Sequence, residues 1–135
     1  MDRQTIQSLL DQAYEARRSG DIEGLLGTFH PEATFEIAGS KAGSASAVTV
    51  RGQQEFRETL TKLVATFNFL ERTIISCLID GNRAAVHSRV KLECAPTNKI
   101  TTTDLLDLWK FDNGKVVELI EFVDTAAVND LVQKD

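Results

Sequence analysis

Residues 101–124, TTTDLLDLWKFDNGKVVELIEFVD, have the pattern of two β-strands joined by a short turn. The Asp-Asn-Gly triplet at 112–114 is typical of a hairpin turn, and apolar residues dominate on both sides of it. Two acids, Asp107 and Glu121, interrupt these apolar strands. An ionised carboxylate is costly to bury without a partner. The acids therefore indicate either a wet pocket or positions that face solvent.

The register of this hairpin determines whether the two acids share a face. A two-residue turn pairs Asp112 with Lys115 and sends the acids to opposite faces. A three-residue loop that ends in a bulged glycine pairs Phe111 with Lys115 instead. Asp107 then lies opposite Leu119, and the acids are diagonal neighbours on one face, roughly 7–8 Å apart. Both faces of both strands are mixed, so the pattern leaves the two registers open.

In the second register, the two faces of the hairpin carry different residues. The face with the acids also carries Leu105, Trp109, Leu119 and Val123. The opposite face carries Leu106, Leu108, Val116, Ile120 and Phe122. Such a second apolar face predicts a covering partner, and a homodimer through the sheet is the simplest one.

The composition narrows the class of protein. The chain has 135 residues, of which 42% are hydrophobic and 26% charged, as expected of one domain with one core. A net charge of -5 without a basic cluster argues against nucleic-acid binding. No apolar run approaches a membrane span and the first residues lack a secretory signal pattern, so we expect a soluble cytoplasmic protein. Cys77 and Cys94 should be distant free thiols.

The periodicity predicts three helices followed by a curved antiparallel sheet, in one domain over 1–135. The expected elements are helices over 3–18, 22–29 and 53–66, a strand over 33–38, strand pairs 69–79 with 83–94 and 99–111 with 115–123, and a helical turn over 126–132. The small, polar stretch 39–47 is expected to be a disordered loop or lid. His30 and His87 lack further metal ligands at useful spacing, and the glycines form no phosphate-binding motif, so we expect neither metal nor cofactor.

These motifs resemble the nuclear transport factor 2-like superfamily, and within it the ketosteroid-isomerase-like and polyketide-cyclase-like (SnoaL-like) proteins. The resemblance spans nearly the whole chain and rests on SGDIE at 19–23, FHPEATF at 29–35, VRG at 50–52, LDLWKF at 106–111 and GKV at 114–116. It implies a cone-shaped α+β fold with an apolar cavity that opens near the helices. It also favours the three-residue loop.

The ketosteroid isomerases match this chain at one catalytic position of three. Asp107 matches their aspartic acid that stays protonated and donates a hydrogen bond to a developing oxyanion. Their general base falls on Ile37, which has no proton chemistry. Their tyrosine falls on Ala13, so Tyr14 is expected to point about 100° away on the helix. The resemblance therefore excludes a standard ketosteroid isomerase.

The limonene-epoxide-hydrolase relatives match the acids better. Their two aspartates, which hold a water, fall on Asp107 and Glu121, whereas their arginine falls on Leu105. Arg17, on the inner side of the first helix, is placed to replace that arginine.

We therefore predict a pocket for a small, largely apolar organic molecule. Asp107 and Glu121 are its candidate catalytic acid and base, for isomerisation, cyclisation, dehydration or epoxide hydrolysis. The candidate ligand-binding residues are Tyr14, Arg17, Ile37, Val86, Val90, Leu105, Trp109, Leu119 and Val123. The alternative is a non-catalytic binding or dimeric interaction module on the same fold.

Overall fold

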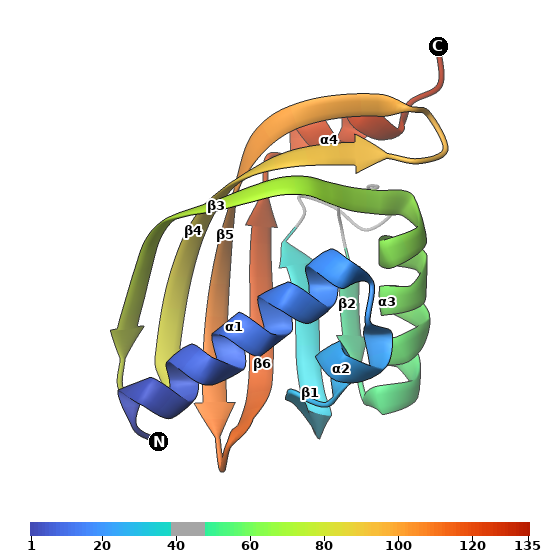
Figure 1. Ribbon diagram of the computed structural model, residues 1–135. Helices are drawn as coiled ribbons and strands as arrows, with labels where there is room; N and C mark the ends of the chain where they lie inside the picture. Colours follow the sequence, from blue (N-terminus) through green and yellow to red (C-terminus); the bar gives the residue numbers. More distant parts are fainter. Residues whose placement is uncertain (39–47) are drawn as a thin grey trace.

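A computed structural model describes residues 1–38 and 48–135, so the predicted lid over 39–47 lies outside the described residues (Figure 1). The elements are α1 (Arg3–Ser19), α2 (Ile22–Leu26), β1 (Phe29–Ala38), β2 (Val48–Arg51), α3 (Gln53–Thr66), β3 (Phe67–Asp80), β4 (Arg83–Cys94), β5 (Lys99–Asp112), β6 (Lys115–Val123) and α4 (Thr125–Val132). The predicted α+β class is confirmed.

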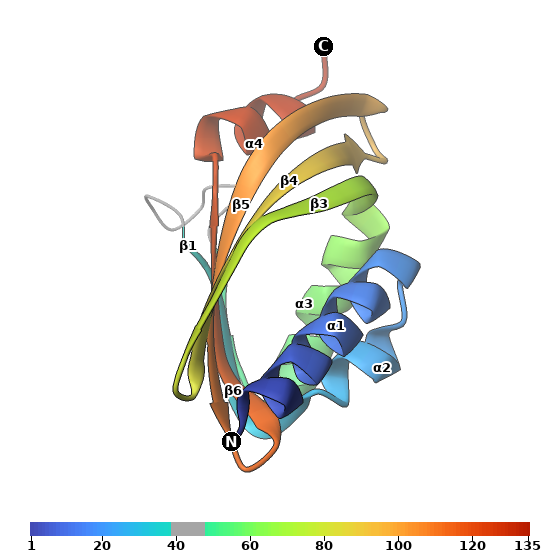
Figure 2. The ribbon, with the colours of Figure 1, turned by 60° about the vertical axis from the view of Figure 1, so that its left-hand side comes forward.

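The strands form one sheet in the order β2-β1-β6-β5-β4-β3, which curves around α1, α2 and α3 (Figures 1 and 2). Neighbouring strands are antiparallel except β1 and β6, which run parallel. The inward side chains of the sheet and the buried stripe of α1, with Ile6, Leu10 and Ala13, share one core. The helical layer therefore covers the concave face of the sheet.

The start of the sheet differs from the prediction. The second helix ends at Leu26 instead of continuing to Phe29, because the Thr28 hydroxyl donates to the Leu25 carbonyl and closes the last turn. The Thr28 carbonyl then accepts from the Val116 amide, and Phe29 enters the sheet beside β6. The short strand β2 had no counterpart in the prediction.

The last hairpin has a two-residue turn, so the predicted three-residue loop is wrong. Asp112 pairs with Lys115, and both turn residues, Asn113 and Gly114, have positive φ. Beyond the turn, β6 contains one surplus residue, Val117, which forms a bulge between the pairs 111–116 and 110–118. The bulge moves every later residue of β6 to the other face.

The bulge changes which side chains meet. Asp107 pairs directly with Glu121 across the strands, instead of lying diagonal to it, and both acids line the same inner face. The shared face is therefore confirmed, although by a different register. Val116 is fully buried beside Phe111 and does not belong to the outer face on which we expected it.

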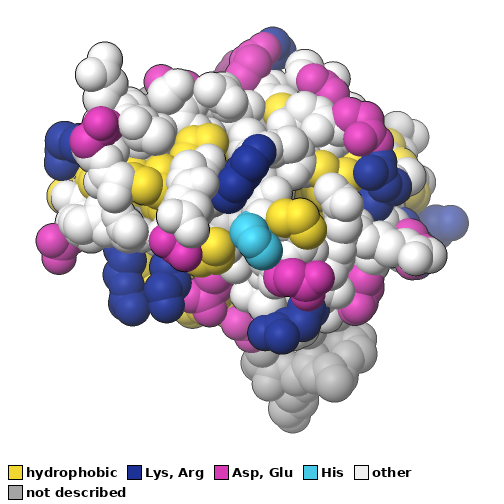
Figure 3. All heavy atoms as spheres, turned by 90° about the horizontal axis from the view of Figure 1, so that it is seen from below, with side chains coloured by type: hydrophobic (Ala, Val, Ile, Leu, Met, Phe, Trp, Pro, Cys, Tyr) yellow, Lys and Arg dark blue, Asp and Glu magenta, His cyan; other side chains and the backbone are white. Residues whose placement is uncertain are grey.

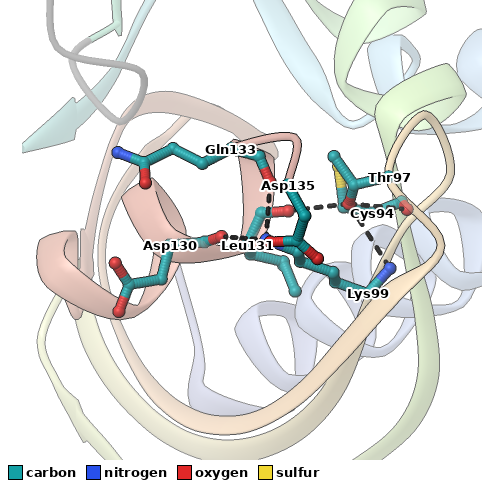
Figure 4. Close-up of polar contacts among 7 residues, drawn as sticks. All are labelled: Cys94, Thr97, Lys99, Asp130, Leu131, Gln133 and Asp135. Atoms are coloured by element: carbon teal, nitrogen blue, oxygen red, sulfur yellow. Dashed lines mark hydrogen bonds and ion pairs between the residues drawn. The ribbon is translucent and has the colours of Figure 1, made fainter.

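The chain closes with α4, which packs on the curled ends of β4 and β5. The Thr97 hydroxyl donates to the Leu131 carbonyl at 2.7 Å, and Lys99 Nζ donates to the Gln133 carbonyl at 2.6 Å (Figure 4). Leu131 packs against inner residues of β4, among them the buried thiol of Cys94. Cys77 and Cys94 are both free thiols, as predicted.

The outer surface carries both charges and apolar side chains. Seen from the end that bears the β5–β6 turn, Lys and Arg are interspersed with Asp and Glu among small apolar patches (Figure 3). On the convex side of the sheet, exposed apolar side chains come from neighbouring strands: Leu78, Leu106, Leu108 and Phe122. Among the described residues, no helix is long and apolar enough to cross a membrane.

Candidate functional site

A pocket of about 100 Å³ lies between the concave face of the sheet and the helices. Because a water molecule needs roughly 10–15 Å³ of such space, the pocket has room for a molecule of roughly seven to ten non-hydrogen atoms. Its walls are mostly aliphatic and aromatic, and Val128 of α4 contributes to them. Four ionisable or charged side chains line it together with Tyr14: Arg17, Arg72, Asp107 and Glu121.

Asp107 is the most buried of these charged groups, at 1% exposure. The Tyr14 hydroxyl, from α1, donates to Asp107 Oδ2 at 2.6 Å. The indole nitrogen of Trp109 in turn donates to the Tyr14 hydroxyl at 3.1 Å. An indole N–H can only donate, so the Tyr14 oxygen accepts from Trp109, while the Tyr14 O–H donates to Asp107.

The second oxygen of Asp107 is different. Among the described residues, Oδ1 is buried and has no hydrogen-bond donor. Burial, followed by the negative charge of the neighbouring Glu121, raises the pKa of Asp107 well above its ordinary value of 3.8. When the acid is neutral, Oδ1 is the oxygen free to carry the proton, because Oδ2 accepts from Tyr14. This O–H can be offered to Glu121 or to a bound molecule.

Tyr14 supports this arrangement as a permanent donor. Burial and the neighbouring Asp107 raise the pKa of the Tyr14 phenol far above its usual range. The phenol therefore keeps its proton and orients the Asp107 carboxyl. Tyr14, one of the predicted ligand-binding residues, lines the pocket together with Ala13, and its phenol is long enough to reach Asp107 on β5.

The two arginines of the pocket occupy different positions. Arg17, predicted from sequence, donates to the carbonyls of Leu63 and Phe67 at 3.4 and 2.9 Å, at the end of α3. Burial lowers the pKa of Arg17 to about 10. Arg72, on β3, donates to the Ser88 hydroxyl at 3.0 Å, and its guanidinium carbon lies 4.4 Å from the centre of the Tyr14 ring.

The structure brings most of the predicted site residues together. The pocket includes the two acids and seven of the predicted ligand-binding residues, namely Tyr14, Arg17, Ile37, Leu105, Trp109, Leu119 and Val123. Val86 and Val90 are corrections: both face inward, but they are 1% exposed inside the packed core and line no part of the pocket. The alternation of β4 gives their face correctly but cannot show that other side chains cover them.

The sequence analysis missed Arg72 and Phe69. Both lie on β3, where bulges after Phe69 and Ile74 interrupt the alternation of inward and outward residues. Arg72 lies between two polar residues, Glu71 and Thr73, so the sequence pattern did not indicate that its side chain faces inward. The residues that the structure describes contain no group of His, Cys, Asp and Glu arranged to hold a metal.

Comparisons with known proteins agree with this architecture. The family model described as a SnoaL-like domain matches residues 10–119. An NTF2-like protein of unknown function from Burkholderia pseudomallei K96243 has a TM-score of 0.84 at 18% identity, covering 98% of this chain and 99% of that chain. An NTF2-like protein from Burkholderia xenovorans LB400 gives 0.80 at 21%, covering 98% and 99%.

An LEH-like epoxide hydrolase from M. tuberculosis is similar over a shorter part, with a TM-score of 0.69 at 14% identity, covering 88% of this chain and 82% of that one. At these identities the solved structures establish the fold. No curated protein sequence matches significantly. Because the family model covers most of the chain, from α1 into β6, this protein belongs to the SnoaL-like domain family.

Proposed function

We propose that the pocket binds a small, largely apolar organic molecule with one reactive oxygen and performs acid–base chemistry on it. The observation that carries the proposal is Asp107 Oδ1, a buried oxygen without a donor, held beside Glu121 in an otherwise apolar pocket. A neutral carboxylic acid in such a site can donate a hydrogen bond or a proton to a substrate oxygen.

The roles follow from the direction of the hydrogen bonds. Asp107 gives the Oδ1 proton to the substrate oxygen. Glu121 acts as the base and takes a proton from the attacking water or from a substrate carbon. In epoxide opening that proton comes from a water whose oxygen bonds to the ring carbon as the C–O bond breaks. The proton on Glu121 then returns to Asp107 across the strand pair. In ketone isomerisation, Glu121 moves a proton between two carbons while Asp107 stabilises the oxyanion.

Two features support this proposal over a ketosteroid isomerase. Ile37 lines the pocket at the position of that family's base, so the base must be another residue. The similar fold of the LEH-like epoxide hydrolase shows that such a scaffold accommodates epoxide chemistry in that protein. The competing candidate, a non-catalytic binding module, is favoured by the predominance of apolar residues in the walls.

The experiment is a turnover panel of small epoxides, such as cyclohexene oxide, and small β,γ-unsaturated ketones. Asp107→Asn and Glu121→Gln should each lower kcat roughly 100-fold or more on any accepted substrate. Glu118→Gln is the matched control, because Glu118 lies on the same strand opposite the exposed Lys110 and should leave kcat unchanged. Unchanged turnover by Asp107→Asn would refute the proposal.

Trp109, the only tryptophan, lies in the pocket wall and reports binding separately from turnover. Saturable fluorescence changes with these probes, together with no turnover by the unmodified protein, would establish the binding module instead.

A further inference from the structure

The proposed acid–base site explains Asp107 and Glu121 but leaves the pocket with a cation that it does not use. Arg72 comes from β3, which lies next to α1 and at the edge of the sheet (Figures 1 and 2). Its side chain reaches inward to the pocket, beside Tyr14 and Asp107. It therefore lies close to the reactive carboxyl.

The contacts of Arg72 hold its plane without neutralising its charge. Its guanidinium carbon lies 4.4 Å from the centre of the Tyr14 ring and 4.8 Å from that of Phe69. One of its nitrogens donates to the fully buried Ser88 hydroxyl. Within residues 1–38 and 48–135, no carboxylate forms an ion pair with Arg72. A guanidinium held by aromatic rings retains N–H groups that suit a planar anion.

Arg17 does not have the same freedom. It lies at the carboxyl end of α3, where helix carbonyls accept its N–H groups and the helix dipole favours a cation. The negative charge of Glu121 also acts on Arg17. Arg17 is thus compensated by its surroundings, whereas Arg72 has no ion pair among the described residues and has only the buried Asp107 as a neighbouring acid.

We propose that the substrate of this pocket carries a carboxylate that pairs with the guanidinium group of Arg72. This ion pair places the reactive oxygen of the substrate at Asp107. This inference rests on the proposed function and names the class of substrate. A bidentate guanidinium–carboxylate contact fixes orientation as well as position. The rest of the molecule lies against the apolar walls, within a pocket that holds roughly seven to ten non-hydrogen atoms in all.

The test compares cyclohexanecarboxylate with cyclohexanecarboxamide, which have the same shape but differ in charge. Trp109 fluorescence reports both affinities, because neither probe absorbs where tryptophan is excited. The unmodified protein should bind the carboxylate at least 10-fold more tightly than the amide, a preference in the range expected for a charge-assisted pair. Equal affinities, or a preference for the amide, would overturn the inference.

Two substitutions locate the preference. Arg72→Gln should abolish this preference by lowering the affinity for the carboxylate at least 10-fold. The affinity for the amide should stay unchanged, which shows that the pocket is intact. Arg72→Lys, which keeps the charge but loses the fork, should give an intermediate preference. Arg89→Gln is the matched control, because Arg89 is exposed and pairs with Asp104 on the outer face. A preference that survives Arg72→Gln would assign the anion to another residue and overturn the inference.

This test can fail independently of the proposed function. If the carboxylate preference is absent but Asp107→Asn loses turnover of neutral substrates, only the substrate class is wrong. If the preference depends on Arg72 but Asp107→Asn retains full turnover, the pocket binds carboxylates and the proposed acid–base function fails.

Discussion

The two faces of β5 carry two aspartates in opposite states. Asp104 is exposed on the outer face and bonded to Arg89 and His87 at 3.0 and 2.9 Å, and these bonds lower its pKa. Asp107, three residues later on the inner face, is buried beside Glu121, and burial raises its pKa. The same residue type therefore has a lowered or a raised pKa, because the alternation of the strand places it beside solvent and cations or against an apolar wall.

Substitutions on the outer face of the sheet should have the largest effect, because they should change the oligomeric state. A homodimer through the sheet stays a prediction, supported by the exposed side chains of Leu78, Leu106, Leu108 and Phe122, which are 38–66% exposed. Leu108→Asp should halve the mass measured by light scattering, because it places a charge at the centre of this surface. Thr102→Asp, also on the outer face of β5, controls for added charge. A monomeric unmodified protein would contradict the dimer.

On the inner face, Tyr14→Phe should destabilise the fold. The substitution removes the donor to Asp107 and leaves the buried indole N–H of Trp109 without its acceptor. An unsatisfied buried polar group costs about 1–3 kcal/mol. Urea denaturation followed by Trp109 fluorescence measures the difference, and Phe69→Leu, which keeps these hydrogen bonds, is the comparison. An unchanged midpoint for Tyr14→Phe would show that the hydrogen-bond chain adds nothing to stability.

The difference between the aspartates also predicts opposite pH dependences. Because folding raises the pKa of Asp107, the unfolded chain loses its proton first as pH rises, and stability falls from about pH 4 upward through the folded pKa. Asp107→Asn should remove this loss, so the stability of the variant relative to the unmodified protein should increase as pH rises above the unfolded pKa of the carboxyl.

The control for this profile is Asp104→Asn. Folding lowers the pKa of Asp104, so its stabilising contribution is present above the unfolded pKa and is lost as pH falls through the folded value. Its exposed pairs make the expected effect small and salt-sensitive. Thermal unfolding from pH 3 to 9 measures both variants, and parallel profiles for the two would contradict the assignment of their states.

The sequence was sufficient for the fold class, since apolar periodicity and the motifs of the superfamily are spread along the chain. It also named both acids, but the residue pattern left open whether they share a face. The register was not predictable, because the surplus residue Val117 looks like any other strand valine. The hydrogen bond from Tyr14 to Asp107 was not predictable from the helix phase, because the length of the side chain decides its reach. Arg72 could not be found, because bulges in β3 conceal which residues face inward.

The bulge at Val117 makes the acid pair depend on chain length as well as composition. Strand side chains alternate, so one residue more or fewer between the turn and Glu121 changes the parity of all that follows. A single-codon deletion there would send Glu121 to the convex side while leaving both acids in the sequence. Relatives that retain both carboxylates but differ by one residue in this strand would therefore lack the facing pair, and sequence identity at the two positions would conceal its loss.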